Sequence, residues 1–451
     1  MGIMTWTMKT MKQIIRWVGG AIVVLIAQPW AAAAQEATLS FEDATLLALE
    51  YNYDVQIARL NEEVSKNRAV PGEAGFLPTV SLTGSGTYAE NASYTEFADP
   101  SLPVIDATGA ATVSYSGGVN VNYVLFNGGG RKVALQQLEN TYEQSQMQTR
   151  QRMEGTVLQV ANRYLAALAA WEVYQINQET VELSRYRYQR AQENYSLGNY
   201  TRLTLLNAEV DLSSDSSSVI QARLAYEKAV VSLNQAMGLS PDTTYQVQSQ
   251  LEFPKTLDLE DLLTDVLTRN TGYLLSRKQL EQSALQVDQA KTGYMPQVSL
   301  VGGYALQGNT NEASFITESR NNGWNAGLQL SYTLYNGGRT QRAQQNAILQ
   351  QEARALALQQ SEDLLETNLI NAYKDYTTNL ELIAMSERNV RLAQANYERS
   401  EVGFGTGQVT GLQLREAQLN LARARYQLMA QRIQTKQAEL NLYYYSGNLV
   451  E

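Results

Sequence analysis

The side chains that carry most enzyme chemistry are missing from this chain of 451 residues, which contains no cysteine and no histidine. Their absence excludes disulfides, thiol nucleophiles, imidazole bases and the commonest zinc ligands. Ser-His-Asp and Cys-His catalysis are excluded with them. Only carboxylate-based or lysine-based chemistry is left.

One glycine-rich stretch invites a chemical interpretation. "NGGGRK" at 127–132 joins glycines to two bases, as phosphate-binding loops do, but it lacks the GxxxxGK[ST] spacing of those loops. The longer stretch "YVLFNGGGRK" at 123–132 returns as "YTLYNGGRTQ" at 332–341. A tight turn that is used twice explains the glycines more simply. We therefore predict no catalytic residue, no cofactor and no metal ion, and so no enzyme.

The first 34 residues have the pattern of a secretory signal peptide. Lys9, Lys12 and Arg16 precede a short apolar run at 17–27, and "AAAA" at 31–34 offers small residues for cleavage. Removing these three of the 35 bases would change the formal net charge from −10 to −13, with 45 acids retained. Such an acidic chain is not expected to bind nucleic acid, which requires a basic face.

The rest of the chain repeats itself, and we divide it into repeats at 35–250 and 251–451. Four segments recur in the same order, the first two at an offset of 218 residues and the last two at 209. The matched pairs are "TLSFEDATLLALEYN" with "TLDLEDLLTDVLTRN", "GFLPTVSLTGSGTYA" with "GYMPQVSLVGGYALQ", the glycine-rich pair above, and "YSLGNYTRLTLLNAE" with "FGTGQVTGLQLREAQ". Each repeat is one structural unit.

Proline is absent from 104–240 and from 297–451, and good helix formers fill much of both runs. Apolar residues recur at helical spacing from about 131 to 195. A helix of about 65 residues would be roughly 95 Å long, wider than a compact domain. We predict long coiled coils.

Each glycine-rich turn follows a segment in which apolar and polar residues alternate. One face of 112–125 carries Val113, Tyr115, Gly117, Val119, Val121, Tyr123 and Leu125, and the other carries mostly Ser, Thr and Asn. With matching segments upstream, this predicts two β-hairpins, at about 77–126 and 295–335. A soluble sandwich shows the same period, but the strand length and the small polar residues favour a membrane barrel with a water-filled lumen.

Four strands cannot close a barrel, because the smallest membrane barrels have about eight. An open edge in lipid leaves backbone groups without partners. Several chains must then share one barrel, and a dimer, a trimer and a tetramer all remain open at this point.

The chain resembles the TolC family of outer-membrane efflux proteins (the outer membrane factors) over essentially its whole mature length. The matching motifs are the strand starts "FLPTVSL" and "YMPQVSL", the junctions "LFNGGGR" and "LYNGGRT", and the turns around Gly198 and Gly407. The resemblance implies a mixed α/β membrane protein and a homotrimer. Each protomer would give four strands to a 12-stranded transmembrane β-barrel, and its long helices to an α-helical barrel in the periplasm.

The resemblance also implies a function and partners. The expected function is a passive exit duct in the bacterial outer membrane, embedded in its lipid, that serves a tripartite efflux or type I secretion system. The duct would receive its substrates from a periplasmic adaptor (membrane fusion) protein and an inner-membrane transporter. The sequence leaves the exported substrate open among drugs, metal ions and proteins.

Three sets of site residues follow from the matched motifs. The adaptor-docking tip would be Leu197, Gly198, Asn199, Thr406, Gly407 and Gln408. The periplasmic gate would be Thr204, Phe404, Val409, Gln413 and Glu416. The barrel-to-helix junction would be Phe126, Asn127, Gly128, Tyr335, Asn336 and Gly337. Only Glu416 keeps a charge among the gate positions, so we expect a gate held by fewer ion pairs than is usual for the family.

One alternative function remains at this stage. A structural coiled-coil protein or adhesin of the cell envelope would need the long helices. It would not need four strands with a lipid-type face.

Overall fold

The computed structural model describes residues 38–248, 251, 253, 259–314 and 316–449. The predicted signal peptide therefore lies outside the described residues. The elements in chain order are β1 (Thr38–Leu39), α1 (Phe41–Tyr51), α2 (Tyr53–Arg68), β2 (Thr79–Thr95), β3 (Ile105–Phe126), α3 (Gly130–Ser196), α4 (Arg202–Met237), β4 (Gln246–Val247), α5 (Leu259–Arg269), α6 (Thr271–Thr292), β5 (Gln297–Asn311), β6 (Glu318–Ser331), α7 (Arg339–Gly405) and α8 (Gly411–Ser446).

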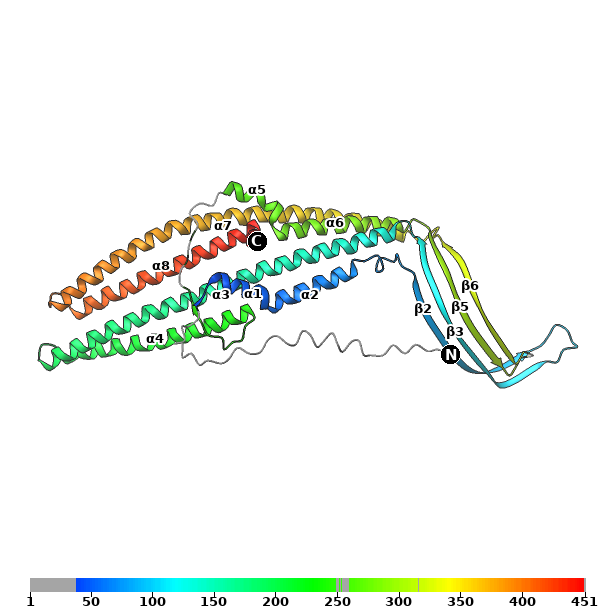
Figure 1. Ribbon diagram of the computed structural model, residues 1–451, viewed down its shortest axis with the longest axis horizontal. Coiled ribbons are helices and arrows are strands. Elements are labelled where there is room, and N and C mark those ends of the chain that lie inside the picture. The colour runs from blue at the N-terminus through cyan, green and yellow to red at the C-terminus, as the bar shows by residue number, and fades with distance from the viewer. Residues whose placement is uncertain (1–37, 249–250, 252, 254–258, 315, 450–451) are drawn as a thin grey trace, which may run out of the picture.

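The same order of elements occurs twice along the chain. In each half two helices precede a β-hairpin, and a very long helix and a return helix follow it. All the helices extend from one end of the sheet formed by β2, β3, β5 and β6, so the molecule is elongated with this sheet at its other end (Figure 1). Among the described residues, no helix is both long enough and apolar enough to cross a membrane.

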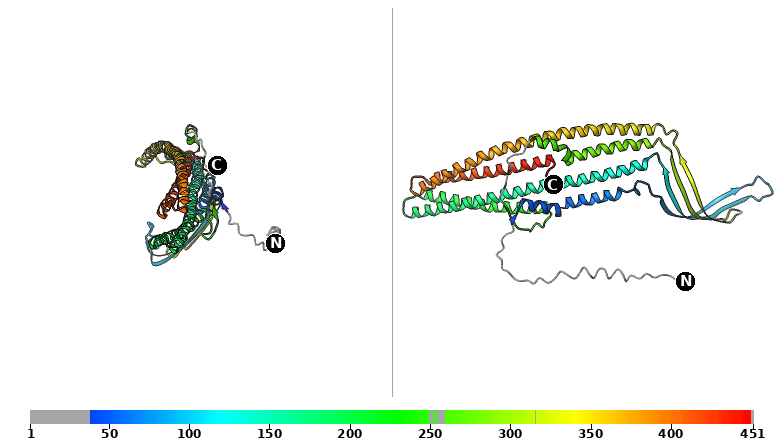
Figure 2. Two further views of the ribbon diagram at one scale, coloured as in Figure 1. Left: turned by 90° about the vertical axis from the view of Figure 1, so that its left-hand side faces the viewer. Right: turned by 45° about the horizontal axis from the view of Figure 1, so that its top comes forward.

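The long helices confirm the prediction of coiled coils. α3 and α7 each contain 67 residues, which corresponds to a length of about 100 Å. α2 and α4 lie end to end along α3, and α6 and α8 lie in the same way along α7 (Figures 1 and 2). The part of each long helix that is farthest from the sheet therefore forms a helical hairpin with its return helix.

The four longer strands form one antiparallel sheet in the order β2-β3-β5-β6. The register places Val119 opposite Leu82 and Tyr304, and Tyr304 opposite Trp324, so these side chains share one apolar face. On the polar face, side-chain hydrogen bonds cross the strands. Ser85 and Ser116 lie 2.8 Å apart, and Ser114 donates to Asn309 at 3.3 Å. The edges of β2 and β6 have no strand partner among the described residues.

Strict alternation does not predict one detail of β3. Strict alternation assigned Leu125 to the apolar face, but the register of β3 against β5 shifts between Val124 and Phe126. Phe126 then pairs with Val298 in the position that alternation would give to Leu125. The extra residue is a β-bulge, which reorients the side chains where the strand ends.

The two halves contain equivalent hydrophobic cores halfway along the helices. In the first half, Val160, Tyr164, Leu233 and Met237 pack with α1 and β4. In the second half, the equivalent cluster joins α5, α7 and α8 and includes the buried Leu442. The hydroxyl of Tyr164 lies 3.1 Å from the Leu39 carbonyl and 3.0 Å from that of Gln248, and burial raises its pKa to about 12. Tyr164 therefore stays protonated and holds the short strands against α3.

Two asparagines at equivalent positions stabilise these cores. Asn52 accepts hydrogen bonds as the N-cap of α2 and donates to the Ala236 carbonyl at 2.8 Å. Asn270 caps α6 and donates to the Tyr445 carbonyl at 3.0 Å. Each asparagine thus ties the start of one helix to the end of the return helix of its own half.

Candidate functional site

The first predicted docking turn joins α3 to α4 at the end of the molecule farthest from the sheet (Figure 1). Leu197 is the C-cap of α3 and is 74% exposed. Gly198 has φ +77°, and the Asn199 amide donates to the Asn194 carbonyl at 2.8 Å. These bonds form the helix-ending motif that requires a left-handed residue.

The second docking turn, between α7 and α8, has the same geometry. Thr406 is the C-cap, Gly407 has φ +76°, and the Gln408 amide donates to the Gly403 carbonyl at 2.8 Å. A Cβ atom at Gly198 or Gly407 would meet no atom within 4 Å. Both glycines are therefore needed for their backbone conformation and not for close packing. Adaptor docking by these six residues stays a prediction.

Two of the five predicted gate residues lie together. Thr204 of α4 and Phe404 of α7 line a cavity of about 280 Å³ between the two helical hairpins. Arg187, Asp211 and Arg415 line the same cavity. A space near the tip thus separates the hairpins and has charged walls.

The other three gate residues have different surroundings. Val409 packs so closely on Gly403 that a Cβ atom there would lie 2.5 Å from a Val409 methyl group. Gln413 forms a capping box with Thr410 at the start of α8. Glu416 is exposed and forms no ion pair with any described residue. Local structure thus accounts for Val409 and Gln413, and Glu416 stays a predicted gate residue.

A buried cluster of charges, which the sequence did not predict, lies behind the tip. Arg415 of α8 holds Asp215 of α4 with two hydrogen bonds, of 2.6 and 2.7 Å. Ser184 of α3, which is 0% exposed, also donates to Asp215, which is 7% exposed. Arg187 donates to Asp211 at 3.0 Å. The two arginines balance the two aspartates, so the cluster joins three helices without net charge.

The electrostatics of this cluster favour its ionised form. Burial alone would lower the pKa of Arg415, but hydrogen bonds to Asp215 and its charge outweigh burial, and the pKa is raised. Burial lowers the pKa of Arg187, an effect that Asp211 opposes. Both guanidinium groups stay charged at any physiological pH, because arginine starts so far above it.

The expectation of a gate held by fewer ion pairs than is usual for the family stays a prediction, and the cluster adds two ion pairs beside the gate positions. The four charged residues of the cluster lie at positions to which the family resemblance assigned no role. The sequence offered one weak signal, since Asp211 and Asp215 are four residues apart and share a helix face. Such a face usually contacts solvent, and only the packing of α8 against α3 brings the Arg415 side chain within reach of it.

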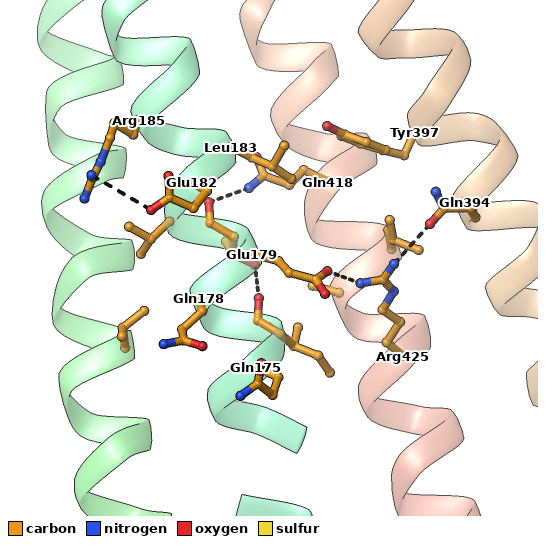
Figure 3. Close-up of a pocket in the computed structure, with 16 residues that line it drawn as sticks. Gln175, Gln178, Glu179, Glu182, Leu183, Arg185, Gln394, Tyr397, Gln418 and Arg425 are labelled. Atoms are coloured by element: carbon orange, nitrogen blue, oxygen red, sulfur yellow. Dashed lines mark hydrogen bonds and ion pairs between the residues drawn. The ribbon is translucent and has the colours of Figure 1, made fainter. Parts of the chain in front are cut away.

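Farther from the tip, the same boundary between the hairpins is also polar. It contains a cavity of about 770 Å³ lined by α3, α4, α7 and α8. Figure 3 shows Arg425 of α8 between Glu179 of α3 and Gln394 of α7, with hydrogen bonds to both. Gln418 donates to the Thr180 carbonyl at 3.0 Å. Polar contacts and open space therefore lie here beside an apolar cluster, in which Leu183 of α3 packs against residues of α7 and α8.

The predicted barrel-to-helix junction lies where the strands meet the long helices. Asn127 accepts from the Arg131 amide at 3.2 Å, and Asn336 accepts from the Arg339 amide at 3.0 Å. Each asparagine thus satisfies a free amide at the start of a long helix. Phe126 and Tyr335 are both exposed.

The glycines of the junction supply left-handed backbone, with one exception. Gly128 and Gly129 have positive φ, as do Gly337 and Gly338, whereas Gly130 begins the helix with ordinary geometry. The first turn therefore takes its left-handed backbone from Gly128 and Gly129, and Gly130 already belongs to α3.

The arginines that begin the long helices have a structural explanation. A base is unfavourable at a helix N-terminus. Arg131, however, donates to the Leu125 carbonyl at 2.8 Å, and Arg339 donates to the Asn336 carbonyl at 3.2 Å. Arg342 donates to the Gly337 carbonyl at 2.7 Å. These side chains satisfy carbonyl groups where the strand hydrogen bonds have stopped.

Comparison with known proteins adds the following findings. The family model described as outer membrane efflux protein matches residues 46–239 and 262–448. The chain is 22% identical to the outer membrane protein TolC of Salmonella enteritidis over 88% of this chain and 81% of that protein. It is also 22% identical to the alkaline protease secretion protein AprF of Pseudomonas aeruginosa, over 98% of this chain and 90% of that protein. The outer membrane channel CmeC of Campylobacter jejuni shares the fold, with a TM-score of 0.73, 18% identity, and coverage of 91% of this chain and 86% of that one.

Proposed function

We propose that this chain, which belongs to the outer membrane efflux protein family and so to the TolC family, is the outer-membrane exit duct of a tripartite efflux or type I secretion system. The observation that carries the proposal is a four-stranded sheet whose two edges have no partner among the described residues, joined through short turns to helices of 67 residues. One chain therefore has the elements of both a membrane barrel and a long tunnel, but it cannot close either alone.

Closure requires the edge strand β2 of one copy to pair with β6 of the next. An edge strand in lipid would leave its amide and carbonyl groups without partners, at several kcal/mol each. Three copies give a barrel of 12 strands, as the family resemblance implies. The apolar face that carries Leu82 and Trp324 then contacts lipid, and the face that carries Ser85 and Ser116 lines the lumen.

Exposed side chains on the outer helices of the protomer support closure of the helical part into a ring. Large apolar side chains are exposed on α4 and on α7, two of them being Val210 and Leu392. In a ring of copies, α7 of one protomer would lie next to α4 of the following one. We assign these faces to the contact between copies.

The gate would lie at the tip, where the α3–α4 and α7–α8 hairpins approach the axis. The charged cavity that includes Thr204 and Phe404 supports this place, and so does the adjacent cluster around Asp215 and Arg415. Ion pairs and hydrogen bonds break one by one as two helices separate, and a compact apolar core resists such separation. The polar contacts and cavities between the hairpins thus suit a passage that opens and closes.

The duct would act with partners. A periplasmic adaptor would contact the two turns at the tip, and an inner-membrane transporter would supply energy and substrate. The protein itself would catalyse no reaction. Relatives named for TolC and for alkaline protease secretion fit efflux and secretion equally, so the substrate class stays open. The alternative of a structural coiled-coil protein or adhesin is not favoured, because the matched family is one of efflux proteins.

Channel activity of the purified protein tests this proposal. The mature chain would be extracted in detergent, run unheated on a gel and added to planar bilayers. We expect a trimer that conducts ions in discrete steps. A monomer that leaves the bilayer current unchanged would refute the proposal.

A further inference from the structure

The two ends of the sheet carry opposite charges. The connections farthest from the helices carry Glu90, Glu96, Asp99, Asp106, Glu312 and Glu318, against the single base Arg320. The end next to the helices carries the acids Glu63, Glu73 and Asp288 and seven bases, Lys66, Arg68, Arg131, Lys132, Lys291, Arg339 and Arg342. A basic belt is conspicuous in a chain with a formal net charge of −10.

Four of these bases have no acidic partner, and we call them the basic collar: Arg68, Lys132, Arg339 and Arg342. All four are exposed, and none forms an ion pair with a described residue. The neighbouring Lys66 and Lys291 differ, because Glu63 and Asp288 pair with them at 3.4 and 2.7 Å.

Arg131 shows at which level of the sheet the collar lies. Its guanidinium carbon is 5.0 Å from the centre of the Phe76 ring and 5.7 Å from that of Tyr123. Tyr123 lies opposite Leu300 in the register, so its side chain belongs to the apolar face. Positive charge therefore begins at the rim of the face that contacts lipid. Exposed Phe126 and Tyr335 lie at the same strand ends, and aromatic residues are enriched at this depth of a membrane protein.

We propose that the basic collar binds the phosphate groups of anionic phospholipids in the periplasmic leaflet. This inference rests on the proposed orientation of the duct, in which the helices extend into the periplasm. The headgroup layer then surrounds the collar, and arginine presents a fork of donors that matches phosphate oxygens. Each base near an anionic membrane surface strengthens binding by about 1 kcal/mol, or about fivefold.

The chain contains its own reporter for a test. After removal of the signal peptide, the only tryptophans are Trp171 and Trp324. Trp324 is 81% exposed on the apolar face, near the middle of β6. Trp171 packs against Tyr174 and Tyr226 among the helices, with ring centres 5.8 and 5.0 Å away. Lipids that carry bromine on their acyl chains quench only a tryptophan that they touch, so they report on Trp324.

The protein would be reconstituted in vesicles of phosphatidylcholine mixed with phosphatidylglycerol, with one lipid brominated at a time. We expect brominated phosphatidylglycerol to quench Trp324 more strongly at equal mole fraction, with a relative binding constant of about three to five. The preference should fall towards one in 1 M salt, because the screening length there is only about 3 Å.

Three variants distinguish the effect of the basic collar from the effect of the overall charge of the protein. The collar variant R68Q/K132Q/R339Q/R342Q should lose the preference for phosphatidylglycerol. The double variant R68Q/K132Q should lose part of it, and neither of its residues makes a described side-chain hydrogen bond whose loss would disturb the fold. The control R163Q/R388Q/R391Q/R399Q removes the same charge from exposed positions on α3 and α7 and should keep the preference.

Two negative results would refute different proposals. If neither brominated lipid quenches Trp324, the membrane position of the sheet is wrong, and the proposed function fails with it. If both lipids quench it equally, or the control loses the preference as the collar variant does, the collar proposal alone is overturned.

Discussion

The four charges near the tip form the most specific contact between the two helical hairpins. Arg415 and Asp215 meet in a bidentate pair, the geometry in which a guanidinium holds a carboxylate best. Because Asp215 is buried, removal of its partner leaves an uncompensated charge, a change that costs of the order of 3 kcal/mol. A closed tip should therefore depend on this pair.

We predict that Arg415→Gln raises the open probability of the channel several-fold. The mutation removes the α8 partner that holds α4 in place. Arg423→Gln on the same helix is the matched control, because Arg423 is exposed and donates only to Asn420 within its own helix. Single-channel recording compares the two variants, and an unchanged open probability in Arg415→Gln would exclude the pair from gating.

A double-mutant cycle tests whether the two residues act as a pair. It compares Asp215→Asn, Arg415→Gln and the double variant. If the effect belongs to the pair, the double variant should open no more than the stronger single variant does. Independent, additive effects would mean that the two residues act through different contacts.

Glu416 allows a second prediction at the residue scale. One exposed carboxylate per protomer becomes a ring of three in the proposed trimer, and such a ring attracts divalent cations. Glu416→Gln should weaken the block of single-channel current by Mg²⁺ or Ca²⁺. The same sensitivity to divalent cations in both proteins would remove Glu416 from the predicted gate.

At the scale of the elements, glycines with similar backbone angles should differ in importance. Gly198 and Gly238 have φ of +77° and +79°. A Cβ atom at Gly198 would meet open space, whereas one at Gly238 would lie 2.3 Å from the Tyr51 carbonyl oxygen.

We predict that Gly198→Ala lowers stability by about 1 kcal/mol, the usual cost of left-handed backbone. Gly238→Ala should cost clearly more, because it also forces the end of α4 away from α1. Thermal unfolding followed by circular dichroism measures both changes. Equal shifts in melting temperature would show that the close approach at Gly238 is not required.

The sequence predicted those elements whose cause is local. Helical spacing and missing prolines predicted the long helix from about 131 to 195, and the structure confirms it as α3. Alternation predicted the strands but could not predict the bulge at Leu125, which depends on pairing with β5. The Arg415–Asp215 pair was beyond prediction for a similar reason, since the two residues are 200 positions apart and meet only after α8 packs against α3. The junction asparagines were predicted, because the repeated motif placed them where a turn must begin.

For the whole molecule, the proposed barrel of three chains depends on how the two open edges of the sheet are closed. The order β2-β3-β5-β6 leaves one edge at each side, and three copies close a ring only if every β2 pairs with a neighbouring β6. A chain without cysteine allows that pairing to be read directly by disulfide formation between introduced thiols.

The decisive measurement is therefore a cross-linking ladder. Ser85→Cys in β2 would be combined with one cysteine in β6 at a time, at Asn321, Gly323, Asn325, Gly327 or Gln329. Each sample would be oxidised and then run on a gel without reductant, both unheated and heated. A shared barrel of three chains predicts that at least one pair of cysteines gives covalent dimers and trimers but nothing larger. No chain with a single cysteine should form a covalent trimer. Ladders that stop at the dimer, extend beyond the trimer or never form with any pair would contradict a shared barrel of three chains.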